Sequence, residues 1–217
     1  MNKYLERANE LVPEMVANRR HFHEYPELRD ELYETVKYVR AQLEEMGYEV
    51  QEICKCGLVA LAGGKKPGKC ILIRGDMDAL PMPEETGLPF SSKNPGAMHA
   101  CGHDFHMAML LGAAKILKEH EDEIEGTVKI CFQPNEETFG GAKAMIDAGV
   151  LENPHVDVAF GIHIGPMADV GTLDYGKGLT MGSADGFDIH VKGKGCHGAA
   201  PHSGISPINI GVHIYLA

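Results

Sequence analysis

Cys101 and His103 stand one residue apart in the segment Met98-His99-Ala100-Cys101-Gly102-His103-Asp104. Thiolate sulfur and neutral imidazole nitrogen are the ligands that Zn²⁺ and neighbouring transition metals prefer. Gly102 between them lets the backbone turn both side chains inward. Taken alone, such a pair is more often a buried thiol beside an ordinary loop histidine than a metal site. Other residues must therefore decide between metal chemistry and packing.

Three apolar, strand-like runs elsewhere in the chain each end in carboxylates or an imidazole. They are 70–75, followed by Asp76 and Asp78; 127–132, followed by Glu136 and Glu137; and 156–162, followed by His163. Each exit alone is compatible with a solvated acidic turn or a hydrogen-bonded core histidine. In α/β sheets, however, the carboxyl ends of strands form the edge where ligands collect. Their coincidence with Cys101 and His103 favours one shared site.

The apolar periodicity predicts a mixed α/β layout that would position these exits. Predicted helices cover 5–22 with a kink or restart at Pro13, 26–46, 106–120, 141–148 and 207–216. Predicted strands lie near 48–54, 57–62, 69–75, 127–133 and 156–164. The segment 79–99 is rich in proline and glycine and has no periodicity, as expected of a loop that shapes a cleft. After Met181 the texture changes: residues 186–192 alternate, and we place a domain boundary near 181–183.

Composition narrows the classes of partner. The 31 acidic and 20 basic residues give a net charge of −11, which disfavours nucleic acid and anionic membranes. No apolar run approaches the length of a membrane span, and the first residues lack the apolar core of a signal peptide. The six cysteines form no Cys-x-x-Cys pair. We therefore predict a cytoplasmic protein with reduced thiols, in which Cys54, Cys56, Cys70 and Cys131 serve packing.

Several longer motifs resemble a known family. In chain order they are Arg19-Arg20-x-x-His23-x-x-Pro26-Glu27-Leu28, Arg74 to Pro81, Met98 to Asp104, Phe132-Gln133-Pro134-x-Glu136-Glu137, Gly161-Ile162-His163, and Gly195-x-His197-Gly198-Ala199-x-Pro201-His202. Together they resemble the M20 metallopeptidase clan, in its amidohydrolase branch of hippurate hydrolases, N-acyl-amino-acid amidohydrolases and auxin-conjugate hydrolases. The resemblance covers nearly all 217 residues, although family members are considerably longer.

The resemblance implies a fold and a domain organisation. The expected fold class is α/β, a zinc-peptidase-like mixed sheet flanked by helices, followed by the start of a smaller α+β lid or dimerisation domain. Residues 1–181 would form an incomplete catalytic domain that lacks its C-terminal part. Residues 182–217 would begin the lid, through which the full-length protein would form a homodimer.

The resemblance also implies metal ligands. Cys101, His103, Glu137 and His163 would hold divalent metal ions, two per site, from the group Zn, Mn, Co and Ni. One further histidine ligand of the family has no counterpart, because His213 lies in the helical tail rather than at the family's position.

Catalytic roles follow the same correspondence. Glu136 would be the general base and acid, its alternative being a second ligand or a surface charge. Asp78 would orient a ligand or a neighbouring imidazole. His197 would donate a hydrogen bond to the tetrahedral oxyanion, its alternative being an ordinary turn histidine. Asp104 and His106 would support the loop of Cys101.

Three functions compete on the sequence alone. The first is a metal-dependent amidohydrolase that cleaves N-acyl amino acids, such as hippurate-like or N-acetyl substrates, with metal-activated water. The second is a truncated, inactive form that at most binds metal. The third is a thiol enzyme built on Cys101 and His103, and it leaves Glu136, Glu137 and His163 without a purpose.

Overall fold

The computed structural model describes residues 2–179 and 182–217. The chain divides into two compact units, Met1–Met167 and Ala168–Ala217, which are described separately below. Of the boundary expected near 181–183, Met181 lies outside the described residues. The assignment of 1–181 and 182–217 as domains stays a prediction.

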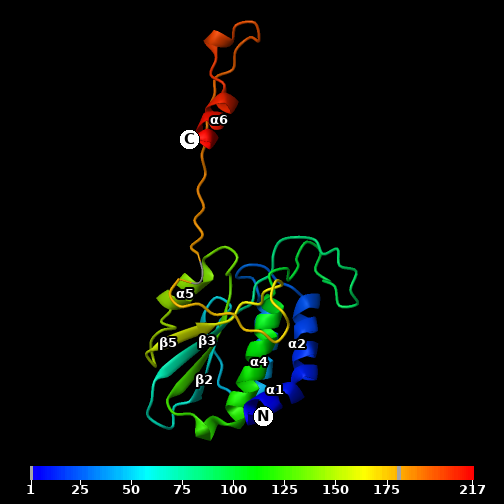
Figure 1. Cartoon of the computed structure of the whole chain (residues 1–217), viewed down its shortest axis with the longest axis vertical. Coiled ribbons are helices and arrows are strands. Elements are labelled where there is room, and N and C mark those ends of the chain that lie inside the picture. The colour runs from blue at the N-terminus through cyan, green and yellow to red at the C-terminus, as the bar shows by residue number, and fades with distance from the viewer. Residues whose placement is uncertain (1, 180–181) are drawn as a thin grey trace. The chain divides into compact units, whose positions relative to one another are not determined.

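The first unit is built on a mixed five-stranded sheet, ordered β1-β2-β4-β3-β5 (Figure 1). Its strands are β1 (Gln51–Cys54), β2 (Gly57–Gly63), β3 (Cys70–Asp76), β4 (Thr127–Gln133) and β5 (Val158–Gly161). β1, β2 and β4 pair antiparallel in turn, whereas β3 runs parallel to both β4 and β5. The predicted α/β class is therefore confirmed. The three parallel strands β3, β4 and β5 position the candidate site, because their carboxyl ends meet at one edge of the sheet.

Helices cover both faces of this sheet. The helices of the first unit are α1 (Lys3–Glu10), α2 (Val12–Glu24), α3 (Tyr33–Glu45), α4 (His103–Glu119) and α5 (Gly141–Asp147), and α1 packs on α2 and α4 rather than on the sheet. The second unit contains α6 (Pro207–Leu216). α3 and α4 bury Val39, Leu43 and Leu111 against one face, and α2 adds Phe22 to the same core. α5 buries Met145 against Val59 and Cys131 on the other face. Within the described residues, no helix is long and apolar enough to cross a membrane.

Some boundaries differ from the prediction for local reasons. The helix expected from Pro26 begins only at Tyr33, because the Glu27 carboxylate accepts the backbone N–H groups of Glu34 and Thr35 and so caps the helix from outside. α4 begins at His103, three residues earlier than predicted, directly after the left-handed Gly102. The alternating segment 186–192 forms no strand.

The helix predicted over 5–22 is two helices, divided at Leu11. Pro13 lies in the first turn of α2, where its missing N–H costs no hydrogen bond, so the expected restart is confirmed.

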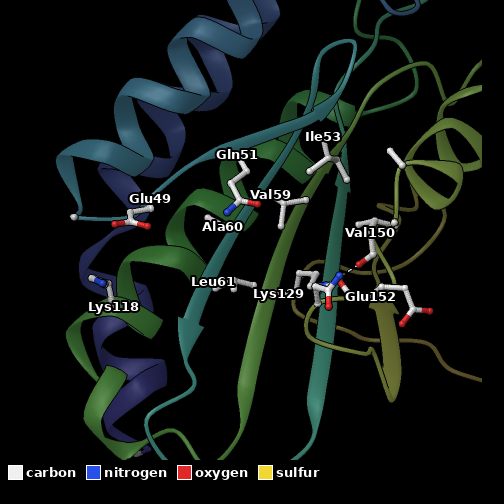
Figure 2. A pocket seen from close by; sticks show the side chains of 14 residues that line it. Glu49, Gln51, Ile53, Val59, Ala60, Leu61, Lys118, Lys129, Val150 and Glu152 are labelled. Carbon is white, nitrogen blue, oxygen red and sulfur yellow. Dashed lines mark hydrogen bonds between the residues drawn. The ribbon is translucent and has the colours of Figure 1, made fainter.

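Lys129 of β4 is an almost fully buried cation at the wall of a pocket of ≈ 530 Å³. Its ammonium donates to the backbone carbonyls of Val150, Glu152 and Pro154 at 2.8, 2.8 and 2.9 Å. Figure 2 shows the side chain directed toward the Val150–Glu152 segment, away from Lys118 on α4. Burial lowers the pKa of Lys129. The lysine thus fastens the segment after α5 to the centre of the sheet.

Lys129→Met is expected to reduce the free energy of unfolding by about 2 kcal/mol, because one buried and two partly buried carbonyls lose their donor. Urea denaturation measures the difference. Lys118→Met, at the same pocket but paired with Glu121 at the surface, is the matched control and should change stability by less than about 1 kcal/mol. Equal losses for the two variants would contradict the assigned role.

Candidate functional site

The predicted site residues of the first unit gather at the carboxyl edge of the parallel strands. β3, β4 and β5 end at Asp76, Gln133 and Gly161, and the loops that follow carry Asp78, the two glutamates and His163. The start of α4 lies near this edge (Figure 1). It brings Cys101 and His103 to the residues that follow the strands. Gly102 between them has φ 96°, and a Cβ there would clash with the side chain of Ile164. Only glycine fits this turn without strain.

Three overlapping groups of ligand-type atoms share His103, and the third, with Asp76 and His106, is described below. The first joins Cys101, His103 and His163, and the second joins His103, Glu136 and Glu137, with the atoms of each group within 4.8 Å of one another. Cys101 Sγ lies 3.4 Å from His163 Nε2. His103 Nε2 lies 3.8 Å from a carboxylate oxygen of each glutamate. All four predicted ligands and the predicted base therefore converge, and their roles stay predictions.

Both imidazoles present the same nitrogen to this cluster. His103 Nδ1–H donates to the carbonyl of Asp78 at 2.7 Å, and His163 Nδ1–H donates to the carbonyl of Ile164 at 2.7 Å. A carbonyl can only accept, so each Nδ1 must carry a proton. In the neutral rings the Nε2 lone pairs then point toward Cys101 and the glutamates, which is the tautomer a metal ligand requires.

Two buried polar atoms of the cluster have no hydrogen-bond partner among the described residues. They are His103 Nε2 and Glu137 Oε1, which face each other across 3.8 Å. Buried polar atoms are seldom left unpaired in native proteins. Burial alone would lower the pKa of His103, but Asp78 and Asp76 raise it overall. Excess negative charge around these unpartnered nitrogen and oxygen atoms, next to the Cys101 sulfur, fits a bound divalent cation.

The carboxyl and carbonyl groups of Asp78 bind the two glutamates and His103, respectively, and so fix their relative positions. Its carboxylate accepts the backbone N–H groups of Glu136 and Glu137 at 2.9 and 3.2 Å, while its carbonyl holds His103. Asp78 itself is 1% exposed. One aspartate therefore fixes both the glutamate pair and the ring orientation of His103.

Cys101 is a poor nucleophile in this setting. Burial, followed by the charge and hydrogen bond of Glu137, raises the pKa of its thiol to about 12. Thiol enzymes need the opposite environment, one that favours the thiolate at neutral pH. The raised pKa of the Cys101 thiol therefore disfavours the thiol-enzyme alternative.

Asp76 and His106 form a hydrogen-bonded pair that adjoins the cluster, because Asp76 Oδ2 lies 3.4 Å from His103 Nε2. His106 Nδ1–H donates to Asp76 at 2.6 Å, and its Nε2 accepts the backbone N–H of Ile164 at 3.0 Å. Arg74 lies 2.6 Å from the other oxygen of Asp76. Although burial would raise the pKa of Asp76, His106, His103 and Arg74 lower it to about 2. Both nitrogens of His106 are occupied, so it supports Ile164 next to His163 rather than offering a ligand.

The remaining candidates lie in the second unit. His197 is exposed, and its Nδ1 accepts the backbone N–H of Ala199 at 3.2 Å, as in a simple turn. His213 lies within α6. The oxyanion role of His197 stays a prediction.

Sequence reasoning missed His99. It is 4% exposed, burial lowers its pKa to about 4, and neither ring nitrogen has a partner among the described residues. Nothing in its neighbours Met98 and Ala100 distinguishes it from an ordinary loop histidine.

Comparison with known proteins places this geometry in a context. The model of peptidase family M20/M25/M40 matches residues 72–214. An N-acetyl-L-cysteine deacetylase of Bacillus subtilis is 43% identical over 199 residues, covering 91% of this chain and 47% of that protein. An N-acyl-L-amino acid amidohydrolase of Geobacillus stearothermophilus is 43% identical over 209 residues, covering 95% and 56%. The IAA-amino acid hydrolase ILR1-like 4 of Arabidopsis thaliana is 46% identical over 206 residues, covering 94% and 46%.

Solved structures of similar fold also include a member of the M20 family. The YXEP protein of Bacillus subtilis, described as a dinuclear metal binding peptidase from the M20 family, matches with TM-score 0.70 and 43% identity over 73% of this chain and 44% of that one. A structure from methicillin resistant Staphylococcus aureus matches with TM-score 0.85 and 36% identity over 100% of this chain and 58% of that one. The chain spans about half the length of the curated relatives it matches.

Proposed function

The chain belongs to peptidase family M20/M25/M40, and from that premise we propose a divalent-metal-dependent amidohydrolase that cleaves N-acyl amino acids. The observation that carries the proposal is the convergence of Cys101, His103, Glu137 and His163, in which His103 Nε2 and Glu137 Oε1 are buried without a hydrogen-bond partner in the described part of the chain. Relatives named for N-acetylcysteine, N-acyl-L-amino acids and IAA-amino acids support the substrate class.

The proposed ligands are Cys101, His103, Glu137 and His163. One sulfur, two imidazole nitrogens and one carboxylate suit Zn, Mn, Co or Ni, and availability selects among such ions. The neighbour described as dinuclear supports two ions per site. Bound there, divalent ions would polarise the acyl carbonyl and lower the pKa of a water.

Glu136 is the proposed proton carrier. Its side chain is 36% exposed, so it reaches both the ligand cluster and the solvent, and Asp78 fixes its backbone. In amide hydrolysis its carboxylate would take the proton of the attacking water and then deliver it to the departing amine nitrogen. His197 would donate a hydrogen bond to the carbonyl oxygen as it becomes negative.

A second candidate is metal binding without turnover. β5 is an edge strand in the described sheet, and Val158 and Phe160 on it are 52% and 46% exposed. Apolar side chains exposed on an edge strand favour association with another surface over turnover by this unit alone.

The finer parts of the proposal are a homodimer and a cytoplasmic location. In residues 182–217, Phe187, Ile208 and Tyr215 are 83%, 78% and 88% exposed, which supports an interface formed by this segment. All six cysteines are free, as expected of a reducing compartment.

The proposal is tested by elemental analysis of the purified protein, followed by assays with a panel of N-acyl amino acids. Bound transition metal and release of the free amino acid would support it. Bound metal without hydrolysis would favour the second candidate, and absence of metal after saturation with Zn²⁺ and dialysis would contradict both.

Asp78→Asn is expected to weaken Zn²⁺ binding by roughly 10–100-fold, as loss of the group that orients metal ligands does. Each carboxylate oxygen of Asp78 accepts one of the backbone N–H groups of Glu136 and Glu137, whereas an asparagine side chain has only one acceptor oxygen and no negative charge. Isothermal titration measures the change. Asp157→Asn is the matched control, since Asp157 also accepts a backbone N–H, that of Cys70, but at the opposite end of β3. An affinity unchanged by Asp78→Asn would remove this residue from the site.

A further inference from the structure

The loop between Asp78 and His99 begins and ends at the proposed metal site. Leu80 and Met98 exchange both backbone hydrogen bonds at 3.0 Å and close its neck. Asp78 precedes this neck, and Cys101 follows it. The position of the loop is therefore geometrically tied to two residues of the site.

His23 of α2 joins this loop to the start of α4. Its Nδ1 lies 2.7 Å from Asp104 Oδ2, and its Nε2 lies 3.1 Å from Glu84 Oε1. All three side chains are at most 3% exposed. The two carboxylates are acceptors and the Asp104 contact is shorter than the 3.3 Å between Arg19 Nη2 and His23 Nδ1, which favours a proton on both ring nitrogens, an imidazolium. A raised pKa of His23, caused first by the hydrogen bond to Asp104, agrees with this protonation.

Glu84 anchors the loop end of this bridge. Besides His23, its carboxylate accepts the backbone N–H of Ser92 at 2.6 Å and the hydroxyl of Thr86. Burial alone would raise the pKa of Glu84, but these hydrogen bonds lower it to about 2. The buried Glu84 carboxylate therefore binds two residues of its own loop, Thr86 and Ser92, and one residue outside it, His23.

An aromatic contact strengthens the same attachment. The guanidinium groups of Arg19 and Arg20 lie 5.0 and 4.9 Å from the ring centre of Phe90, a loop residue. Arg19 also lies 2.8 Å from Asp104 and 4.3 Å from the ring centre of Phe105. Hence the Arg-Arg-x-x-His motif of α2 holds the loop on one side and the first turn of α4 on the other.

The α4 end of the bridge adjoins a proposed ligand. Asp104 is fully buried, follows His103 directly, and its other oxygen accepts the N–H of Phe105 at 3.0 Å. A shift of Asp104 would move the backbone that carries Cys101 and His103. Displacements of about 1 Å are enough to impair a site of this kind.

We propose that the buried hydrogen-bonded side chains Glu84, His23 and Asp104 form a positioning bridge between the 79–99 loop and the backbone of Cys101 and His103. Through this bridge, the conformational stability of the loop and the position of the two proposed ligands are coupled. This inference rests on the proposed function for the meaning of that placement. Because coupling is reciprocal, ordering the loop favours metal binding, and metal binding protects the loop.

Glu84→Ala in the 217-residue chain tests the bridge. Amide hydrogen exchange of the metal-free protein should accelerate about tenfold or more, both in the loop and in residues 99–106. Affinity for Co²⁺, followed by its near-ultraviolet thiolate absorption, should fall by roughly 10–100-fold. Adding Co²⁺ should slow exchange of the loop in the wild-type chain and have little effect on the loop in the variant.

Two further variants separate positioning from loss of structure. Glu84→Gln keeps the acceptor oxygen and should restore Co²⁺ affinity to within about threefold of wild type. Lys93→Gln is the matched control, because Lys93 also ties the loop to α2, through an exposed ion pair with Glu24 at 2.8 Å, but does not contact the bridge. It should leave both measurements unchanged. His23→Gln gives a second break in the bridge if Glu84→Ala does not fold.

Faster exchange confined to 81–97, with residues 99–106 and Co²⁺ affinity as in wild type, would overturn the proposal. If the wild-type chain binds no Co²⁺, the proposed function fails. In that case the bridge is still tested by amide exchange of residues 99–106 in the metal-free variants, which should be faster than in the metal-free wild-type chain.

Discussion

Glu136→Gln is expected to keep the metal in place and to lower the rate of N-acyl amino acid hydrolysis by roughly 10²–10⁴-fold. Glutamine has nearly the same shape as glutamate and can keep the backbone contact with Asp78, but it cannot take a proton from water. The loss should appear mainly in kcat, since the proton moves during the chemical step. The variant is assayed in whichever chain length hydrolyses the substrate, with metal content measured on the same sample.

Glu125→Gln is a suitable control for this comparison, because Glu125 is exposed and precedes β4 at the opposite edge of the sheet. Its kcat should equal that of the parent. Full turnover by Glu136→Gln would place the general base elsewhere, whereas loss of the metal would identify Glu136 as a ligand.

Cys101→Ala is expected to lower Zn²⁺ affinity by more than the 10–100-fold that loss of an outer partner costs. It removes the only sulfur of the cluster and leaves His163 Nε2 without its neighbour at 3.4 Å. Equilibrium dialysis with elemental analysis measures the occupancy. The fold should remain intact, because Cys101 is only half-buried and lies in a loop.

Cys196→Ala controls for incidental binding by thiols, since Cys196 is exposed and lies in the second unit. Its zinc affinity should match that of the parent. Unchanged occupancy in Cys101→Ala would exclude Cys101 from the ligand set and leave the cluster without its most distinctive donor.

Much of the candidate site follows from the sequence because its residues stand at strand exits. The parallel register of β3 with β4 and β5 brings the exits of Asp78, Glu137 and His163 to one edge, and Gly102 turns Cys101 toward them. Because each apolar run is followed directly by these side chains, the sequence pattern predicts that they lie at the ends of strands. The helix pattern likewise locates α2 and α4 to within a few residues.

Other features depend on contacts that span long stretches of chain and leave no local pattern. The tautomer of His103 is fixed by a backbone carbonyl 25 residues earlier. The start of α3 is displaced by the carboxylate of Glu27, and His23 meets an aspartate 81 residues away. A sequence motif such as Arg-Arg-x-x-His shows that residues act together but does not show what they hold.

The central claim is that Cys101, His103, Glu137 and His163 bind divalent metal, and anomalous diffraction at the zinc edge from crystals grown with Zn²⁺ tests it most directly. The account predicts a peak about 2.3 Å from Cys101 Sγ or about 2.0–2.2 Å from the imidazole nitrogens and the Glu137 carboxylate. A protein saturated with zinc whose anomalous peaks all lie away from these four side chains would contradict it.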